Sequence, residues 1–368
     1  MTARARRVLM SADTVGGVWS YAIELGRALA PYGTEVVLAA FGGHASAEQA
    51  RQAAAVKNLV LFDAPWKCEW MDDPWDDLLH AGDWLLELAA RSAPDVVHLN
   101  HYAHGALPWP APVLMVGHSD VLSWFRAVRG HEAPPSWDRY RDVVGRGLRA
   151  AAHVVAPTET MLRSLAADFG PLLRATVIPN GRDALQLRAA DDKAPLVFAA
   201  GRLWDDAKNL AALEAAAPRL RWPVVVAGST AHPDGGTKQP RHVHVLGPCE
   251  PDEMSELYAR AAIYASPARY EPFGLSILEA ALAGCALVLG DIPSLRENWY
   301  AAAQFVPPDD PDALVAAIDR LIDDAALRRD YGRAAHARAR SLSPPRMAAA
   351  YADAYGALLA AATEVVCA

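Results

Sequence analysis

Short apolar runs alternate with longer stretches whose apolar positions recur every three to four residues, almost from end to end of the chain. The short runs predict buried strands, and the longer stretches predict amphipathic helices. In the first half, strands are predicted at 7–10, 35–39, 59–61, 96–99, 113–116, 153–156 and 175–178, with a helix at about 20–30. Strands that alternate with helices indicate a parallel sheet with helices on both faces.

A polar, Asp-rich stretch, 182–195, interrupts this pattern and is predicted to be an interdomain linker. Further strands are predicted at 196–200, 224–227, 242–246, 262–265, 286–289 and 304–306, followed by helices at 312–323, 325–341 and 346–362. The 368 residues fit two domains of roughly 150 to 200 residues each. We therefore expect an α/β protein with two Rossmann-like, doubly wound domains, 1–183 and 184–345, and a C-terminal helix in 346–368.

Composition excludes several classes of protein. A hydrophobic content of 52% excludes disorder, and a mean hydropathy of +0.04 excludes a multispanning membrane protein. A net charge of −8 argues against nucleic acid as the main partner. The basic residues Arg4, Arg6 and Arg7 are more typical of a solvated terminus than of a membrane contact. The apolar run after them is too short for a signal peptide, so we expect a cytoplasmic protein.

The four cysteines lie at positions without disulfide or metal-ligand spacing, which predicts reduced thiols. They are Cys68, Cys249, Cys285 and Cys367.

The segment 271–284 sets two carboxylates, Glu271 and Glu279, among apolar or small residues. Pro272 suits the first turn of a helix and Gly284 suits its C-terminal cap, so a helix of about three turns is predicted. Glu279 then falls on the apolar stripe of that helix. A buried carboxylate needs a polar partner, which either an arginine or the hydroxyls of a bound ligand could provide.

The loop after the first predicted strand contains Gly16 and Gly17 and leads directly into a helix. Paired glycines let the backbone approach a ligand, and a helix N-terminus favours an anion; a tight turn is the alternative. The loop lacks G-x-G-x-x-G, which disfavours a nicotinamide site. His118 follows another strand at the same rim, where it could contact substrate or be an ordinary loop histidine.

In the second domain, Arg202 and Lys208 follow the first strand. A diphosphate leaving group needs positive charge, which Arg and Lys supply where no metal does. The alternative is a pair of surface cations bound to Asp205 and Asp206.

No metal site is expected from the sequence. His98, His101 and His104 are spaced by three, but without a carboxylate at matching spacing we favour a strand end and polar loop. Asp310 and Asp312 form the one Asp-x-Asp, which is more typical of a helix N-cap and first turn.

Together these features resemble the retaining, nucleotide-sugar-dependent glycosyltransferases of the group-1, family-four type. The most specific mark is E-x7-E, formed by Glu271 and Glu279. Supporting marks occur in the right order along nearly the whole chain, at 16–18, 177–181, 201–203 and 208–209. The resemblance implies a GT-B fold, in which two Rossmann-like domains face each other across a deep cleft and the C-terminal helix crosses back to the N-terminal, acceptor domain.

The resemblance also implies roles for residues of the C-terminal, donor domain. Glu279 would bind the ribose hydroxyls of the donor nucleotide, so that its partner is a diol rather than an arginine. Arg202 and Lys208 would hold the diphosphate, helped by the backbone of Gly274 and Leu275.

Further roles follow for the sugar and the base. Glu271 would face the transferred sugar, and His118 would contact it near the reacting carbon. Gly16 and Gly17 would let the first domain close on phosphate and acceptor. Leu246 and Gly247 lie where the base usually rests.

The implied reaction transfers a hexose from a nucleotide-diphosphate sugar, by default UDP-glucose, to a hydroxyl of a glycan, a lipid-linked sugar or a small natural product. It proceeds by front-face substitution with retention and needs neither metal nor cofactor. Membrane contact would be peripheral at most. The alternatives are a nucleotide-sugar 2-epimerase on a similar scaffold and a noncatalytic nucleotide-sugar-binding protein.

The chain departs from the family pattern at two places, which puts acceptor preference in doubt. Gly117 and Ser119 flank His118 where many relatives have Thr and Asp, and Asn209 replaces the glycine that usually follows Lys208. Several first-domain tryptophans could stack on an acceptor, although packing at the core or its rim is the default expectation. They are Trp66, Trp70, Trp75 and Trp84.

Overall fold

The structure is a computed structural model that describes residues 4–183, 193–232 and 235–366. The chain forms two compact units. Unit 1 comprises Met1–Arg126, His131–Gly181 and Pro344–Ala368, and unit 2 comprises Ala127–Gly130 and Arg182–Ser343. Most of the predicted linker, 184–192, lies outside the described residues.

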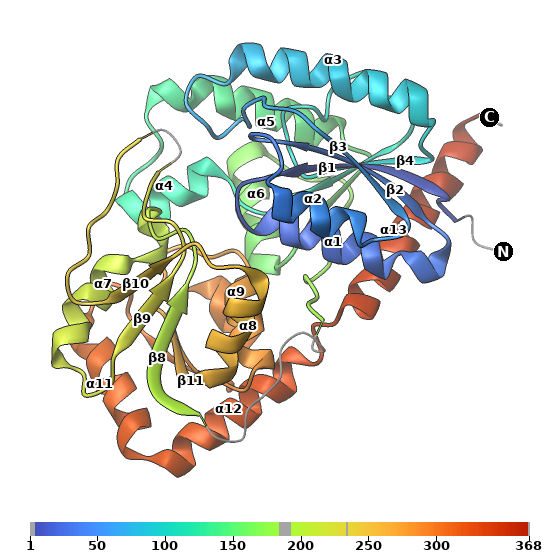
Figure 1. The fold of residues 1–368 in the computed structure, drawn as a ribbon. Coiled ribbons are helices and arrows are strands. Elements are labelled where there is room, and N and C mark those ends of the chain that lie inside the picture. Colours follow the sequence, from blue (N-terminus) through green and yellow to red (C-terminus); the bar gives the residue numbers. More distant parts are fainter. Residues whose placement is uncertain (1–3, 184–192, 233–234, 367–368) are drawn as a thin grey trace. The chain divides into compact units, whose positions relative to one another are not determined.

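Unit 1 contains a parallel sheet of seven strands in its described part, in the order β3-β2-β1-β4-β5-β6-β7 (Figure 1). The strands are β1 (Arg7–Asp13), β2 (Glu35–Phe41), β3 (Leu59–Asp63), β4 (Val96–Leu99), β5 (Val113–Val116), β6 (His153–Ala156) and β7 (Ala175–Val177). Every residue of β4 and β5 is buried, because helices cover both faces of the sheet. This burial explains why these strands consist mostly of apolar residues.

The helices of unit 1 lie between its strands, except for α13, which comes at the C-terminal end of the chain. They are α1 (Gly17–Ala28), η1 (Ala30–Tyr32), α2 (Ala47–Ala54), α3 (Trp75–Ser92), α4 (Val121–Arg129), η2 (Pro135–Trp137), α5 (Asp138–Ala150), α6 (Glu159–Phe169) and α13 (Pro344–Val366). The C-terminal helix α13 packs on α1 and β4, where Tyr351 and Tyr355 are fully buried in the core. It begins at Pro344, two residues earlier than predicted, because proline suits the first positions of a helix.

Unit 2 contains a second parallel sheet, in the order β10-β9-β8-β11-β12-β13. Its strands are β8 (Ala194–Ala200), β9 (Val224–Ala227), β10 (His244–Gly247), β11 (Ala261–Ser266), β12 (Ala286–Gly290) and β13 (Ala303–Val306). Its helices are η4 (Asp206–Lys208), α7 (Leu210–Ala216), η5 (Ala217–Arg219), α8 (Pro251–Arg260), α9 (Leu275–Leu282), α10 (Pro293–Trp299), α11 (Pro311–Asp323) and α12 (Ala325–Ala339). As predicted, Asp310 caps α11, since its carboxylate accepts a hydrogen bond from the Ala313 N–H at 2.9 Å.

Helix α9 is shorter than predicted, and Pro272 is not in its first turn. The helix begins only at Leu275 because Gly274, with φ 90°, adopts a left-handed conformation that helical residues do not share. Its end is as predicted: Gly284, with φ 81°, follows the helix. The Gly284 and Cys285 N–H groups donate to the carbonyls of Ala281 and Ala280, as in a Schellman motif.

The carboxyl ends of parallel strands share one edge of each sheet. In unit 1 this edge carries the loop with Gly16 and Gly17 after β1 and the loop with His118 after β5. In unit 2 it carries the loop with Lys208 after β8 and the loop with Glu271 after β11, the strand beside β8. The sequence-predicted polar residues therefore lie at the edge where α/β proteins bind ligands.

Candidate active site

Three glycine turns bring neighbouring loops of unit 2 together. The Gly201 N–H donates to the Ala227 carbonyl at 3.0 Å, and the Gly228 N–H donates to the Gly247 carbonyl at 2.7 Å. A Cβ on Gly228 would overlap the Gly201 carbonyl, so glycine is required there. Gly247 itself has open space beside it, and the neighbouring Leu246 is 48% exposed.

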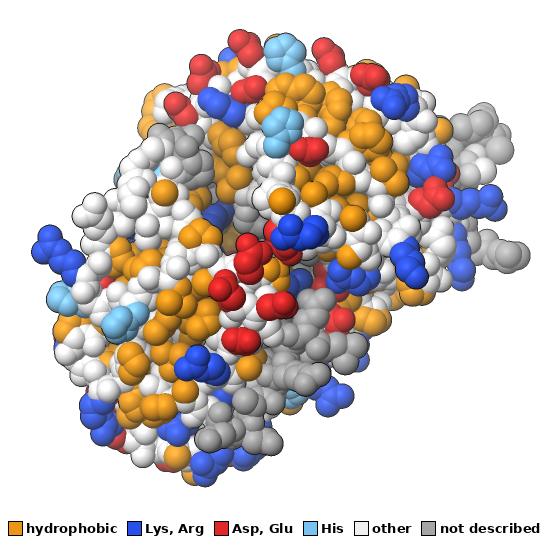
Figure 2. Space-filling view, in the orientation of Figure 1, with side chains coloured by type: hydrophobic (Ala, Val, Ile, Leu, Met, Phe, Trp, Pro, Cys, Tyr) orange, Lys and Arg blue, Asp and Glu red, His pale blue; other side chains and the backbone are white. Residues whose placement is uncertain are grey.

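Leu246 therefore offers an apolar surface next to an accessible backbone. Figure 2 shows apolar side chains gathered on the face of unit 2 that carries β9 and β10. Such a surface suits the planar face of a nucleotide base.

Asn209 explains one departure from the family pattern. Its backbone is left-handed, with φ 56° and ψ 46°, a conformation that asparagine tolerates better than most residues. Its side-chain N–H groups donate to the carbonyls of Pro267 at 2.9 Å and Pro308 at 2.7 Å. Asn209 thus meets the backbone requirement that a glycine would meet, and it also ties the end of η4 to two other loops.

Lys208 and Glu271 form an ion pair. Their side chains are only 20% and 11% exposed, respectively, so water screens the pair weakly. The Glu271 backbone is held in turn, because its carbonyl accepts a hydrogen bond from the Ser294 hydroxyl at 2.6 Å. Two charged groups that are 63 positions apart in the chain thus meet at the carboxyl edge of the sheet.

Arg202 is placed differently from Lys208. Its guanidinium pairs with Asp205 at 3.0 Å and lies 5.4 Å from the ring of Trp204, with 39% of the side chain exposed. The surface alternative considered for the two cations therefore describes Arg202 and not Lys208. Asp206 pairs with Lys238 at 2.6 Å.

The start of α9, at Leu275, lies four residues beyond Glu271 and is fixed by Gly274. A Cβ on Gly274 would lie 2.7 Å from Cδ1 of Ile277, and its positive φ would be strained in any other residue. Because the backbone N–H groups of a first helical turn point out along the axis, the stretch from Gly274 to Leu275 presents a partial positive charge. Lys208 and the helix start thus give two sources of positive potential on one edge.

Glu279 has an arginine partner within unit 2. The Arg182 Nε lies 2.8 Å from Oε1 of Glu279, and the two side chains are 22% and 16% exposed. A half-buried carboxylate requires such a counter-charge when no ligand is bound. Sequence reasoning missed Arg182 because it assigned this residue to the linker.

In unit 1, the loop after β1 leaves Gly16 and Gly17 exposed at the start of α1. Gly16, with φ 102° and ψ −149°, is the N-cap, so α1 starts at Gly17, about one turn earlier than predicted. The turn is stabilised by Asp13, whose carboxylate accepts a hydrogen bond from the Val15 N–H at 3.0 Å.

His118 is held from two sides. Its Nε2 lies 2.8 Å from Oδ1 of Asn100, and its ring packs edge-on against Tyr21 with a centroid distance of 4.6 Å. The Asn100 side-chain N–H donates to the Ser11 carbonyl at 2.6 Å, which directs the Asn100 oxygen toward His118. His118 therefore donates from Nε2 and keeps Nδ1 as an acceptor. Burial lowers the pKa of His118, so the ring is neutral at pH 7.

The three regularly spaced histidines do not converge on one point. His98 forms hydrogen bonds with the hydroxyls of Tyr21 at 3.2 Å and Tyr355 at 2.7 Å. His104 forms a hydrogen bond with the Leu78 carbonyl at 3.1 Å. His101 instead faces Cys68, with 3.6 Å between Nε2 and Sγ.

The four first-domain tryptophans considered for acceptor stacking are all half-buried. Trp66 and Trp84 pack edge-on at 5.2 Å, and the Trp75 ring lies under the Arg139 guanidinium at 4.1 Å. Trp70 and Trp84 pack on the core around Leu85. These contacts indicate that the tryptophans pack at the rim of the hydrophobic core.

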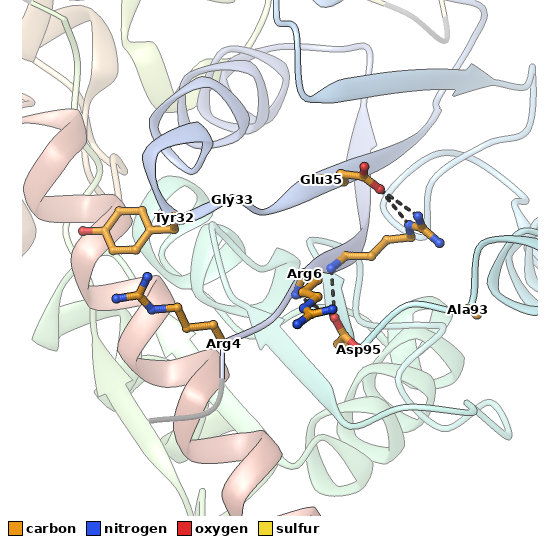
Figure 3. Close-up of a pocket in the computed structure, with 8 residues that line it drawn as sticks. Arg4, Arg6, Tyr32, Gly33, Glu35, Ala93 and Asp95 are labelled. Carbon is orange, nitrogen blue, oxygen red and sulfur yellow. Dashed lines mark hydrogen bonds and ion pairs between the residues drawn. The ribbon is translucent and has the colours of Figure 1, made fainter. Parts of the chain in front are cut away.

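One surface depression of unit 1 has a volume of about 900 Å³ (Figure 3). It lies at the amino end of β1, with Arg4, Arg6 and Tyr32 among its lining. The Arg7 guanidinium pairs with Glu35 at 2.8 Å, and Asp95 accepts hydrogen bonds from the backbone at the start of β1. No predicted site residue lines it.

Two Rossmann-like domains in one chain, with cations and a helix start at the carboxyl edge of the second sheet, define a protein of the GT-B class. Two family models match the chain, "Glycosyltransferase Family 4" over residues 15–184 and "Glycosyl transferases group 1" over residues 194–324. Between them they match more than half of the chain. The protein belongs to this glycosyltransferase family, and the resemblance seen in its motifs is confirmed.

Individual relatives agree with this assignment. Glycogen synthase from Mycobacterium tuberculosis is 30% identical over an alignment of 287 positions, which covers 73% of this chain and 65% of that protein. The chain thus spans just under two thirds of the length of that relative.

Among solved structures, sucrose-phosphate synthase from Thermosynechococcus elongatus is similar with a TM-score of 0.79 at 18% identity, covering 97% of this chain and all of that one. HepE from Anabaena, in complex with UDP and glucose, is similar with a TM-score of 0.75 at 16% identity, covering 96% of this chain and all of that one. At these identities the likeness shows the fold, and it confirms the predicted GT-B architecture. In the part of the chain that the structure describes, no helix is long and apolar enough to cross a membrane.

Proposed function

We propose that the protein is a retaining hexosyltransferase that moves a hexose from a nucleotide-diphosphate sugar to a hydroxyl acceptor. The observation that carries this proposal is the ion pair between Lys208 and Glu271, directly before the start of α9. One cation and one helix N-terminus at this point suit a diphosphate, and the adjacent carboxylate suits the hydroxyls of the attached sugar.

Lys208 changes partner in the proposed reaction. Without donor, the Lys208 ammonium and the Glu271 carboxylate compensate each other in a poorly solvated place. When the diphosphate binds, Lys208 and the N–H groups after Gly274 hold it, and Arg202 adds charge from the more exposed side. Glu271 is then left to accept hydrogen bonds from the sugar. These side chains supply positive charge to the leaving group, so the donor site needs no metal ion.

The chemical step is a front-face substitution. The bond between the anomeric carbon and the diphosphate oxygen breaks, and a bond to the acceptor oxygen forms on the same face, which retains the configuration. The acceptor proton passes to the departing diphosphate oxygen. His118, with Nδ1 as an acceptor, would receive a hydrogen bond from a hydroxyl of the transferred sugar, and Gly16 and Gly17 would let backbone approach the phosphate and acceptor.

UDP-glucose is the first donor to test. HepE, which shares the fold, was solved with UDP and glucose, and the exposed Leu246 beside the open backbone of Gly247 offers a surface for the base. For the acceptor we propose a hydroxyl of a glycan, a lipid-linked sugar or a small natural product, with peripheral membrane contact at most. Cys68, Cys249 and Cys285 are free thiols, which supports a cytoplasmic location; Cys367 lies outside the described residues.

A thermal-shift screen tests the donor. UDP-, GDP-, ADP- and dTDP-sugars are added separately to the protein in EDTA. A ligand at a hundred times its Kd stabilises a protein by about 2.7 kcal/mol, which raises the unfolding temperature by several degrees. We expect this shift with UDP-glucose, and transfer to an acceptor with the α configuration kept. Stabilisation only after metal is added, or release of an epimerised nucleotide sugar without acceptor, would contradict the proposal.

Glu279→Gln tests the proposed ribose contact. The substitution keeps the shape of the side chain but replaces a charge-assisted hydrogen bond, so UDP affinity measured by calorimetry should fall roughly ten- to hundredfold. Arg182→Gln is the matched control, because it breaks the same ion pair and keeps the carboxylate. We expect Arg182→Gln to lower thermal stability while UDP affinity stays within a few-fold. Equal losses of affinity in the two variants would assign the effect to the ion pair instead of the ribose.

A further inference from the structure

Three buried side chains of different chemistry meet in unit 1. Asp13 ends β1, Cys68 lies between β3 and α3, and His101 follows β4. Their exposed fractions are 6%, 0% and 2%, and one ligand atom from each lies within 4.8 Å of the other two. Carboxylate oxygen, thiolate sulfur and imidazole nitrogen are the ligands that zinc-type ions take in proteins.

The distance between two of these atoms already fits a shared ion. Sγ of Cys68 lies 3.6 Å from Nε2 of His101. A tetrahedral ion with bonds of about 2.3 Å to sulfur and about 2.0 Å to nitrogen separates its two ligands by about 3.5 Å. The pair needs almost no movement to bind such an ion. A simple S–H to nitrogen hydrogen bond has a similar length, so the distance alone does not decide between the two.

The contacts around the ligands resemble an outer coordination shell. Nδ1 of His101 lies 3.1 Å from the Ser11 hydroxyl, and the ring packs on Phe41 at a centroid distance of 4.1 Å. These two contacts hold Nε2 toward the thiol. Outer partners of this kind fix the orientation of a metal-bound histidine.

Charge also favours a dication. One thiolate, one carboxylate and one neutral imidazole balance a charge of two, which matters because an uncompensated buried charge is costly. Glu69, next to the cysteine, is 4% exposed, and its Oε2 has no hydrogen-bond partner within the described residues. Gly42 packs closely on the cluster, since a Cβ there would lie 3.1 Å from Sγ of Cys68, a tighter contact than side chains usually make.

We propose that Asp13, Cys68 and His101 bind one divalent transition-metal ion of the zinc type, with the fourth position open to water or another ligand. The ion would join the loops after β1, β3 and β4 and so brace the turn that carries Gly16 and Gly17. Sequence spacing hides this site, because the three ligands come from three separate segments. The site is independent of the donor chemistry proposed above, which needs no metal.

Cobalt titration tests the site. Metal-free protein, prepared with EDTA and a phosphine reductant and then desalted, is titrated with CoCl2 while the absorption spectrum is recorded. We expect a thiolate-to-cobalt charge-transfer band in the near ultraviolet, with tetrahedral d–d bands in the visible, that saturates at one equivalent and is removed by added ZnCl2. Cys68→Ser should abolish the charge-transfer band. Cys285→Ser, which changes an equally buried thiol without His or Asp neighbours in the metal cluster, should keep it.

A second variant keeps the test valid if Cys68→Ser misfolds. His101→Asn keeps the thiol and a polar side chain but removes the ring nitrogen, and it should weaken cobalt binding at least tenfold while circular dichroism shows a folded protein. Absence of a thiolate band in the native protein would overturn the proposal. A band that persists in Cys68→Ser, or equal cobalt affinity in His101→Asn and the native protein, would overturn it as well.

Discussion

Lys208→Ala is expected to lower kcat/KM for the nucleotide-sugar donor by roughly two to three orders of magnitude, the usual cost of removing one group that stabilises a leaving anion. Lys208 is only 20% exposed, so its charge acts on the diphosphate with little screening by water. Arg202, at 39% exposure and already paired with Asp205, cannot replace it. The measurement is initial rate against donor concentration at fixed acceptor.

Substitution of Glu271, the partner of Lys208, is expected to change UDP affinity differently from substitution of Lys208. In Lys208→Ala, both UDP and UDP-glucose should bind more weakly. In Glu271→Gln, Lys208 no longer has to leave a carboxylate to reach the diphosphate, so UDP should bind as well as before or better. UDP-glucose should gain less or lose affinity, since Glu271 is proposed to meet the sugar. Calorimetry with the two ligands separates these cases, and equal effects on both ligands in Glu271→Gln would refute the sugar-facing role.

Arg219→Ala is the control for loss of a cation from unit 2. Arg219 forms an exposed ion pair with Asp312 at 2.6 Å, and exposed pairs contribute little. Its activity should therefore stay within twofold of the native protein. If Arg219→Ala and Lys208→Ala lose similar activity, general charge loss rather than phosphate binding explains the Lys208 result.

The two sheets could be predicted from sequence because their strands are buried on both faces. Strands β4, β5, β6 and β9 have the predicted bounds, since each is a short, mostly apolar run that is followed directly by a polar or turn residue. The predicted helix boundary is wrong where the backbone conformation of a single residue sets the start of the helix. Pro272 suggested a helix start, but the left-handed Gly274 delays it to Leu275.

The contacts of the site were harder to predict than its residues. The E-x7-E motif pointed to Glu271 and Glu279, but spacing carries no information on which cations face them. Lys208 and Arg182 reach these carboxylates from other segments, through the fold of the sheet and its loops. The same limit hid the meeting of Asp13, Cys68 and His101, whose positions in the sequence show no metal-ligand spacing.

Asn100 belongs to no predicted motif, but it determines which ring nitrogen of His118 carries the proton. Its amide bonds to the Ser11 carbonyl, so its oxygen faces His118 and fixes which ring nitrogen carries hydrogen. Burial lowers the pKa of His118 well below the usual value of a histidine, so the ring is uncharged at neutral pH. A neutral ring with Nδ1 as an acceptor is the form that a sugar hydroxyl can use as a partner.

His118→Ala should lower kcat by about a hundredfold or more, within the range for a positioned histidine at a reacting centre, while UDP affinity stays unchanged. His80→Ala, which removes an exposed histidine of α3, should leave both values unchanged. Because its pKa is lowered, His118 gains a proton only below pH 6.5. Protonation of His118 should therefore cause no loss of native kcat between pH 8 and pH 6.5. A loss centred at pH 6.5 that is absent in His118→Ala would contradict the neutral ring. A fully active His118→Ala would contradict the contact with the sugar.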